Sequence, residues 1–273
     1  MENNNITKKI GKLYIVSTPI GNKDDISLRA IKTLQSCDIV VCEEGKIGAR
    51  LLHSYNISKP LEILNEHNEE SKSFELLRLL KEGKRLALTS DCGTPLLADP
   101  GLLLVNSAIE NNIEVRSIPG VSSIMAGIVL SGFTIDRFLF AGFLSRDNDT
   151  RIKQIKSLSK ETKTVVIFET PYRILPVLQA FADIIPYRKA YIGCNLTLPF
   201  ETNHYGNFLS LNEKFKELKF KGEFIIVFEK SLKRIYSDKF EKKEKTMKRD
   251  ENKNFKRKNN FNKKDRLIVK RKR

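Results

Sequence analysis

Apolar and polar positions follow two different periods along the chain, and these periods predict an alternation of strands and helices. Short aliphatic runs predict five strands, at Leu13–Val16, Asp38–Cys42, Leu61–Leu64, Arg85–Thr89 and Glu114–Ile118. Between them, apolar residues recur at steps of three and four, which predicts helices over Ile26–Leu34, Ala49–Tyr55, Glu69–Lys81 and Leu102–Asn111. Strict alternation of strand and helix indicates a mainly parallel sheet with helices on both faces.

The helix predicted over Glu69–Lys81 has the clearest amphipathic pattern of the four. Its expected core-facing side carries five apolar residues, Phe74, Leu76, Leu77, Leu79 and Leu80. Lys72, Glu75, Arg78 and Lys81 are expected to face water.

A turn-rich segment, 118–123, interrupts the alternation and divides the chain into two predicted domains. Its Pro and Gly end a strand, and its serines suit the N-cap of a following helix. Beyond it we predict helices at Ser123–Leu130, Thr150–Ser159 and Tyr172–Asp183, and strands at Phe138–Gly142, Thr164–Phe168, Lys189–Ile192 and Phe224–Phe228. The late strands favour a mixed sheet with antiparallel pairs. The expected domains are two α/β units, 11–118 and 119–230.

Charge is distributed unevenly and sets the last part of the chain apart. The net charge is +16, and residues 231–273 alone hold 19 basic and 6 acidic residues, a net +13. A segment this basic and polar cannot bury enough apolar surface to offset the entropy lost on ordering. We therefore expect a disordered tail. Phe240, Phe255 and Phe261 lie among its basic residues, a pattern that favours RNA contact through phosphates and stacked bases.

The composition also bears on the cellular compartment. The four cysteines, Cys37, Cys42, Cys92 and Cys194, show neither a CxxC motif nor metal-ligand spacing with the three histidines. The polar N-terminus does not resemble a signal peptide, and no apolar run is long enough for a membrane helix. These features are typical of a soluble cytoplasmic protein without a metal.

Two loops rich in Gly, Pro, Asp and Thr each follow a predicted strand, at Ser17–Asn22 and Ser90–Gly101. Loops at the carboxyl ends of strands form the ligand crevice of open α/β sheets. The chain has no G-x-x-x-x-G-K-[ST], no G-x-G-x-x-G and no G-x-S-x-G motif, so the common phosphate, dinucleotide and serine-hydrolase sites are not indicated. The loops therefore predict a site for a small polar molecule.

These loops belong to an ordered set of motifs spread over about residues 11–229. The set comprises Leu13–Asn22, Asp25–Ala30, Glu66–Glu69, Ser90–Pro95, Asp99–Gly101, Pro119–Ser123, Leu130–Gly132, Asp136–Phe140, Gly142–Leu144 and Phe168–Arg173. Together they resemble the tetrapyrrole methylase superfamily, and within it most closely the branch that methylates a cytidine 2′-hydroxyl of 16S rRNA. Several motifs in the correct order are far more specific than any single one.

The resemblance implies two α/β domains, S-adenosylmethionine bound in the cleft between them, and a homodimer. It also implies the 30S ribosomal subunit as partner. The cofactor site would be formed by Pro19, Gly21, Asp91, Gly93, Thr94, Pro95, Pro119, Gly120, Ser122 and Ser123. Each Gly or Pro can equally be a plain structural turn.

The resemblance also suggests candidates for acceptor activation, since a ribose hydroxyl is a poor acid and needs a base or a cation beside it. These candidates are Glu43, Glu44, Lys46 and Glu169; Glu169 can also pair with Arg173, four residues later. Residues 42–46 read C-E-E-G-K where the family has A-E-D-T-R, and residues 194–198 read C-N-L-T-L where it has R-E-L-T-K. These departures leave the substrate open.

Two other functions are compatible with the sequence. One is a methyltransferase of the same superfamily acting on a tetrapyrrole or another small molecule, against which the basic tail counts. The other is a non-catalytic RNA-binding assembly factor, suggested by residues 194–198. The retained cofactor loops count against that second alternative.

Overall fold

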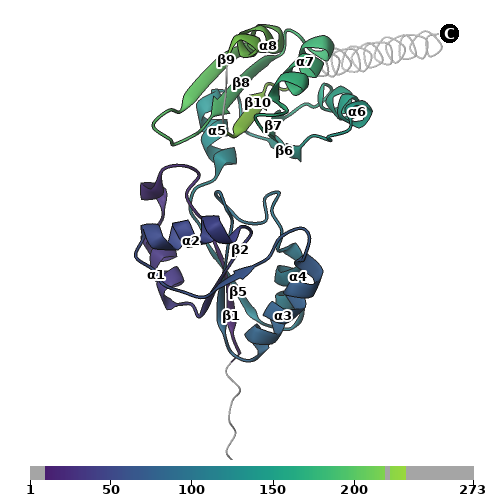
Figure 1. Ribbon diagram of the computed structural model, residues 1–273. Coiled ribbons are helices and arrows are strands. Elements are labelled where there is room, and N and C mark those ends of the chain that lie inside the picture. Colours follow the sequence, from purple (N-terminus) through teal and green to yellow (C-terminus); the bar gives the residue numbers. More distant parts are fainter. Residues whose placement is uncertain (1–9, 219–221, 232–273) are drawn as a thin grey trace, which may run out of the picture.

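The computed structural model describes residues 10–218 and 222–231, and these form two five-stranded sheets (Figure 1). The first sheet contains β1 (Lys12–Val16), β2 (Ile39–Cys42), β3 (Leu61–Ile63), β4 (Arg85–Thr89) and β5 (Glu114–Ile118). Its strand order is β3-β2-β4-β1-β5, and all neighbouring strands are parallel. The predicted parallel sheet is thus confirmed, with strand bounds within one residue.

Helices cover both faces of this sheet, as the alternating pattern predicts. They are α1 (Leu28–Ser36), α2 (Gly45–Ser54), α3 (Glu69–Lys81) and α4 (Leu102–Glu110), with a short 3-10 helix at Lys23–Asp25. Leu34 and Leu52 of α1 and α2 join one core cluster, while Leu80 and Leu104 of α3 and α4 join the other. Figure 1 shows these two pairs of helices on opposite sides of the strands.

The side of α3 that enters the core differs from the predicted side at one position. Phe74 is 67% exposed, so its assignment to the core is wrong. The buried residues are Ser73, Leu76, Leu77 and Leu80, which lie three and four residues apart and share one stripe of the helix. Phe74 falls outside this stripe, whereas the small Ser73 lies within it and is buried.

The second sheet is mixed, which confirms the prediction of antiparallel pairs. It contains β6 (Phe138–Phe143), β7 (Thr164–Glu169), β8 (Lys189–Cys194), β9 (Thr202–Asn207) and β10 (Phe224–Phe228), in the order β6-β7-β10-β8-β9. Only β6 and β7 run parallel; the other neighbouring pairs are antiparallel.

Four further helices pack on this sheet: α5 (Ser123–Ser131), α6 (Asn148–Leu158), α7 (Ile174–Ile184) and α8 (Phe208–Glu217). Residues of α5 join one core cluster, and those of α6, α7 and α8 join another, in which Phe181 stacks on Phe208 with ring centroids 4.4 Å apart. The sequence pattern does not predict β9 or α8. The strand Thr202–Asn207 is polar and lies at the sheet edge, so it has no clear hydrophobic alternation.

Among the described residues, no helix combines the length and the apolar character needed to cross a bilayer. The basic tail lies almost entirely outside the described residues, which end at Ser231. Ser231 itself is buried, and its backbone N–H donates to the Glu161 carbonyl at 2.7 Å. The division into two domains, 11–118 and 119–230, and a tail, 231–273, stays a prediction from the sequence.

Candidate active site

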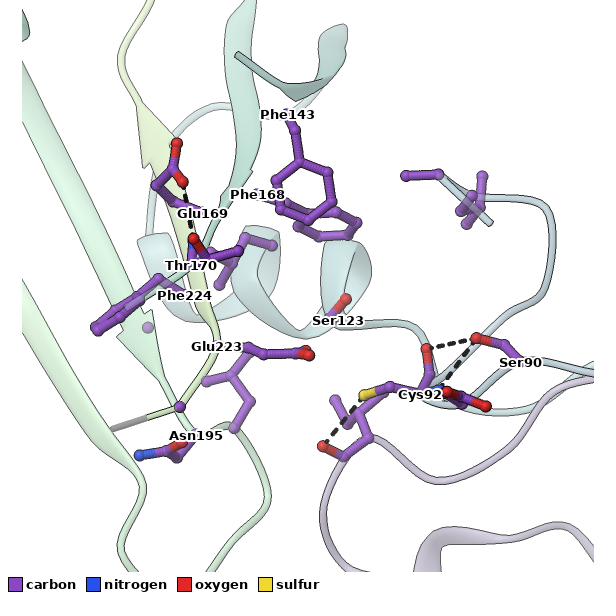
Figure 2. Close-up of a pocket in the computed structure, with 18 of the residues that line it drawn as sticks. Ser90, Cys92, Ser123, Phe143, Phe168, Glu169, Thr170, Asn195, Glu223 and Phe224 are labelled. Atoms are coloured by element: carbon purple, nitrogen blue, oxygen red, sulfur yellow. Dashed lines mark hydrogen bonds between the residues drawn. The ribbon is translucent and has the colours of Figure 1, made fainter. Parts of the chain in front are cut away.

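A cavity of about 550 Å³ lies where the carboxyl ends of strands from both sheets meet (Figure 2). From the first sheet, Glu43 follows β2, and Ser90, Asp91 and Cys92 follow β4. The second sheet contributes residues at the ends of β6, β7 and β8 and before β10, including Phe143, Phe168, Glu169, Asn195 and Glu223. The volume is typical of a small-molecule site, and strand ends are where α/β folds bind ligands.

The loops after β1 and β4 are joined by buried hydrogen bonds. The Thr18 backbone N–H donates to the Gly93 carbonyl at 2.8 Å, and the Gly93 N–H donates to Thr18 Oγ1 at 3.1 Å. Thr94 Oγ1 donates to the Val121 carbonyl at 3.0 Å, which ties in the loop after β5. Hydrogen bonds thus join three segments that are far apart in sequence into one edge beside the cavity.

Glycines let these loops approach one another closely. Gly93 has φ +85°, a conformation that residues with a side chain rarely adopt. A Cβ on Gly21 would lie 2.7 Å from the Leu196 carbonyl oxygen of the second sheet's β8–β9 loop. The Asn22 N–H donates to Thr197 Oγ1 at 2.9 Å in the same contact. The loop after β1 therefore packs directly on a loop of the other sheet.

The predicted cofactor residues fall into two groups. Asp91 and Ser123 line the cavity itself. The remaining residues lie in the joined loops outside the lining: Pro19, Gly21, Gly93, Thr94, Pro95, Pro119, Gly120 and Ser122. Gly120 also permits close packing, because a Cβ there would lie 3.0 Å from the Ser17 Cβ.

Glu43 is the predicted catalytic candidate with the most perturbed environment. Burial, together with repulsion from the neighbouring carboxylates Asp91, Asp99, Glu66 and Glu44, raises the pKa of its carboxyl to about 7. This crowding arises because β2 and β4 are adjacent in the sheet, so the residues that follow them meet. A carboxyl with a pKa near neutrality in a cleft is suited to general acid or base chemistry.

Glu44 and Lys46 lie differently from Glu43. Both are exposed and absent from the cavity lining. Glu44 occupies the N-cap position of α2, and its backbone N–H donates to Asp91 Oδ1 at 3.2 Å. The structure therefore brings only Glu43 and Glu169 of the four candidates to the cavity.

The Glu169 carboxylate is fully buried, and both of its oxygens accept hydrogen bonds from the protein. Arg173 Nη2 donates to Oε1 at 3.0 Å, and the Thr170 N–H donates to Oε2 at 2.9 Å. The predicted pairing with Arg173 is thus confirmed. Burial raises the pKa of Glu169, while the Thr170 N–H and Arg173 oppose that shift. This arrangement anchors the end of β7 to the turn before α7.

Sequence reasoning missed several residues that line the cavity. Phe143 and Phe168 lie within motifs that it did recognise, Gly142–Leu144 and Phe168–Arg173, but only polar side chains were selected there. Glu223 has no recognisable sequence signal, since it is a single acidic residue directly before β10.

The divergent segment 194–198 also borders the cavity. Asn195, Leu196 and Leu198 line it, and Thr197 makes the contact with Asn22 described above. Asn195 and Thr197 both have positive φ, 54° and 67°, so the backbone of this loop is held in an uncommon conformation. The unusual sequence therefore lies at the site rather than on a remote surface.

No group of three or more His, Cys, Asp or Glu side chains within residues 10–218 and 222–231 is arranged to hold a metal ion. Fold and cavity together define a two-sheet α/β protein with a cavity at its strand ends. Comparison with known proteins identifies its family: the model for tetrapyrrole (corrin/porphyrin) methylases matches residues 12–208. The chain belongs to this family, as the motifs predict.

Individual relatives are also similar over most of their length. Ribosomal RNA small subunit methyltransferase I of Thermotoga maritima is 39% identical over 218 residues, 80% of this chain and 98% of the relative. The protein of the same name from Bacillus subtilis is 35% identical over 222 residues, 81% of this chain and 76% of the relative.

Solved structures share the fold at much lower identity. Uroporphyrin-III C-methyltransferase from Thermus thermophilus, complexed with S-adenosylhomocysteine, has a TM-score of 0.56 at 16% identity, covering 79% of this chain and 97% of that one. Diphthine synthase has a TM-score of 0.60 at 17% identity, and the match covers 80% of this chain and 90% of that one. These similarities confirm the predicted two-sheet α/β architecture.

Proposed function

We propose that this protein is an S-adenosylmethionine-dependent methyltransferase that methylates the 2′-hydroxyl of a cytidine in 16S rRNA. Relatives named ribosomal RNA small subunit methyltransferase I, aligned over about four-fifths of the chain, carry this proposal. The cavity at the strand ends supports it, because it provides one place where cofactor and acceptor can meet.

The described residues fit the cofactor. S-adenosylmethionine presents hydroxyls, an adenine edge and a sulfonium, so its site needs accessible backbone groups and carboxylates rather than a phosphate cradle. Gly93, Gly120 and Gly21 let the loops approach one another closely beside the cavity, and Asp91 and Ser123 present polar side chains to it. We assign the cofactor to these residues together with Pro19, Thr94, Pro95, Pro119 and Ser122.

When bound, S-adenosylmethionine supplies the electrophilic methyl group. The chain's own residues align the acceptor hydroxyl and remove its proton. Glu43 fits the second role, because its carboxyl lines the cavity and its pKa of about 7 leaves a substantial deprotonated fraction at neutral pH. Glu169 fits a positioning role, because both of its oxygens are bound by the protein. Glu44 and Lys46 are proposed to act from outside the cavity, on the approaching RNA.

The proposed partner is the 30S ribosomal subunit. We assign the basic tail, with its net +13, to contact with rRNA phosphates. The Thermotoga relative is matched over 98% of its length, while a fifth of this chain falls outside that match, so the relative has no room for an extension of this size. The tail is therefore proposed to strengthen binding rather than to perform the reaction. We also propose that the protein forms a homodimer, as is typical of the superfamily.

The decisive experiment uses purified full-length protein, methyl-labelled S-adenosylmethionine and 30S subunits lacking the modification. We expect label on a single cytidine 2′-hydroxyl, mapped by nucleotide. Cofactor binding without label on any ribosomal particle would contradict the rRNA assignment and favour a small-molecule acceptor. Absence of cofactor binding would favour a non-catalytic RNA-binding protein.

A further inference from the structure

Three phenylalanines of the second sheet form an aromatic shelf at the cavity, defined here as Phe140, Phe143 and Phe168. The Phe168 ring contacts both of the others, with centroid distances of 4.9 Å to Phe140 and 5.7 Å to Phe143. Phe143 and Phe168 line the cavity, and Figure 2 shows their rings next to each other on one side of it. The contacts are edge-on and tilted, the arrangements that aromatic rings prefer.

A β-bulge in β6 creates this shelf. Phe140 pairs with Val166 and Phe143 pairs with Phe168, so three steps along β6 correspond to only two along β7. In a regular strand, residues three apart project from opposite faces. The extra residue, together with Gly142 at φ +64°, turns Phe143 to the side of the sheet where Phe140 meets Phe168.

The shelf leaves a large apolar ring uncovered at the cavity. Phe143 is 44% exposed, although Phe168 behind it is half-buried. An exposed aromatic ring that is supported from behind and faces a binding cavity offers a flat stacking surface. A bulge that re-aims a side chain is typical of functional sites.

The position of the shelf indicates which base it receives. The loops assigned to the cofactor follow β1, β4 and β5 of the first sheet, whereas the shelf belongs to β6 and β7 of the second. Sequence-specific RNA recognition uses nucleotides whose bases are unstacked, and such bases bind on aromatic side chains.

We propose that Phe143 is the stacking surface for the base of the target nucleotide, which positions the attached 2′-hydroxyl in the cavity. This inference rests on the proposed function and adds to it the subsite that holds the base. Phe168 acts through Phe143 by supporting its ring, and Phe140 supports Phe168.

The test compares Phe143→Ala with Phe138→Ala. Phe138 lies on the same strand, is 40% exposed and is absent from the cavity lining, so it is a matched control. With unmodified 30S subunits, we expect Phe143→Ala to lower kcat/KM about tenfold or more, while KM for S-adenosylmethionine and the activity of Phe138→Ala stay unchanged. Phe143→Tyr, which keeps the aromatic face, retains activity; Phe143→Leu, which keeps only apolar bulk, does not.

A fluorescence measurement separates the target base from the cofactor's adenine. The chain contains no tryptophan, so Phe143→Trp introduces a single reporter on the shelf. We expect S-adenosylhomocysteine to leave its emission unchanged. Quenching by S-adenosylhomocysteine would place the cofactor adenine on Phe143 and overturn the inference.

The outcomes for the inference and for the proposed function are distinguishable. If the wild-type protein transfers no methyl group to 30S subunits, the proposed function fails, and the inference fails with it. If the wild-type protein is active and folded Phe143→Ala, verified by its Tm, keeps the same kcat/KM, only the inference fails.

Discussion

Thr18 and Gly93, 75 residues apart in sequence, exchange two hydrogen bonds beside the cavity: Thr18 N–H to the Gly93 carbonyl, and Gly93 N–H to Thr18 Oγ1. Thr18 Oγ1 also donates to the Ser90 carbonyl at 3.0 Å, and the side chain is almost fully buried. One hydroxyl therefore acts as both donor and acceptor between the loops after β1 and β4.

Replacing Thr18 by Val removes this hydroxyl and leaves the Gly93 N–H without its partner. We expect a loss of about 1–3 kcal/mol in the free energy of unfolding and a Tm lower by roughly 2–10 °C. Thr18→Ser keeps the hydroxyl and serves as the control. Equal Tm values for the two variants, measured by calorimetry, would show that these hydrogen bonds do not stabilise the fold.

The catalytic assignment of Glu43 predicts a pH profile and a mutational effect. Because the base acts in its ionised form, wild-type kcat rises with pH through about 7, the pKa set by burial and the carboxylates of Asp91, Asp99, Glu66 and Glu44. Glu43→Gln lowers kcat about 10²–10⁴-fold, with little change in cofactor Kd. Initial rates of the wild-type and Glu43→Gln enzymes, measured from pH 5.5 to 9, test the pH profile and the mutational effect. A Glu43→Gln enzyme with normal kcat would exclude Glu43 as the base.

The same carboxyl predicts how stability depends on pH. Its pKa in the folded protein is raised from 4.5 to about 7, so its stabilising contribution is present below pH 4.5 and is lost as pH rises through 7. Glu43→Gln mimics the protonated form. Since solvent screening reduces the gain to about 1 kcal/mol, its Tm at pH 8 should exceed that of the wild type by about 2–4 °C. At pH 4 the two proteins should unfold at similar temperatures.

The buried pair Glu169–Arg173 predicts a strong coupling between two substitutions. Arg173→Met leaves a buried carboxylate without its cation, so we expect a loss of about 3–5 kcal/mol in the free energy of unfolding. Adding Glu169→Gln removes the uncompensated charge and should restore part of that loss. Urea unfolding of both single variants and the double variant measures the coupling energy. Additive effects would mean that the 3.0 Å contact contributes little.

The basic tail predicts a salt-dependent interaction with RNA. Truncation after Ser231 removes the net +13 while keeping the Ser231 N–H bond to Glu161. We expect weaker 30S binding at low salt and a smaller slope of log K against log [salt], because fewer counterions are released. The methylated position should not change. Identical binding curves for the full-length and truncated proteins would show that the tail makes no contact with rRNA.

Much of the fold follows from local sequence patterns. The strands β1, β4, β5 and β10 and the helix α3 are predicted with bounds matching to within a residue, because short apolar runs indicate the strands and apolar residues at steps of three and four indicate the helix. The polar edge strand β9 and the following α8 escape prediction, since a half-exposed edge has little hydrophobic pattern. Phe74 is expected in the core but is exposed, because apolar character alone does not decide which side of a helix is buried.

The sequence by itself determines the α/β class, the family and the loops that lie beside the cavity, because these depend on short motifs whose residue types and order are local. Only the tertiary structure decides which of those residues act together. Burial, together with the adjacency of β2 and β4 that crowds Glu43 against Asp91 and Asp99, raises the Glu43 pKa, and a bulge of one residue turns Phe143 toward Phe168. Both effects depend on strand order and register, which arise from the packing of the whole sheet.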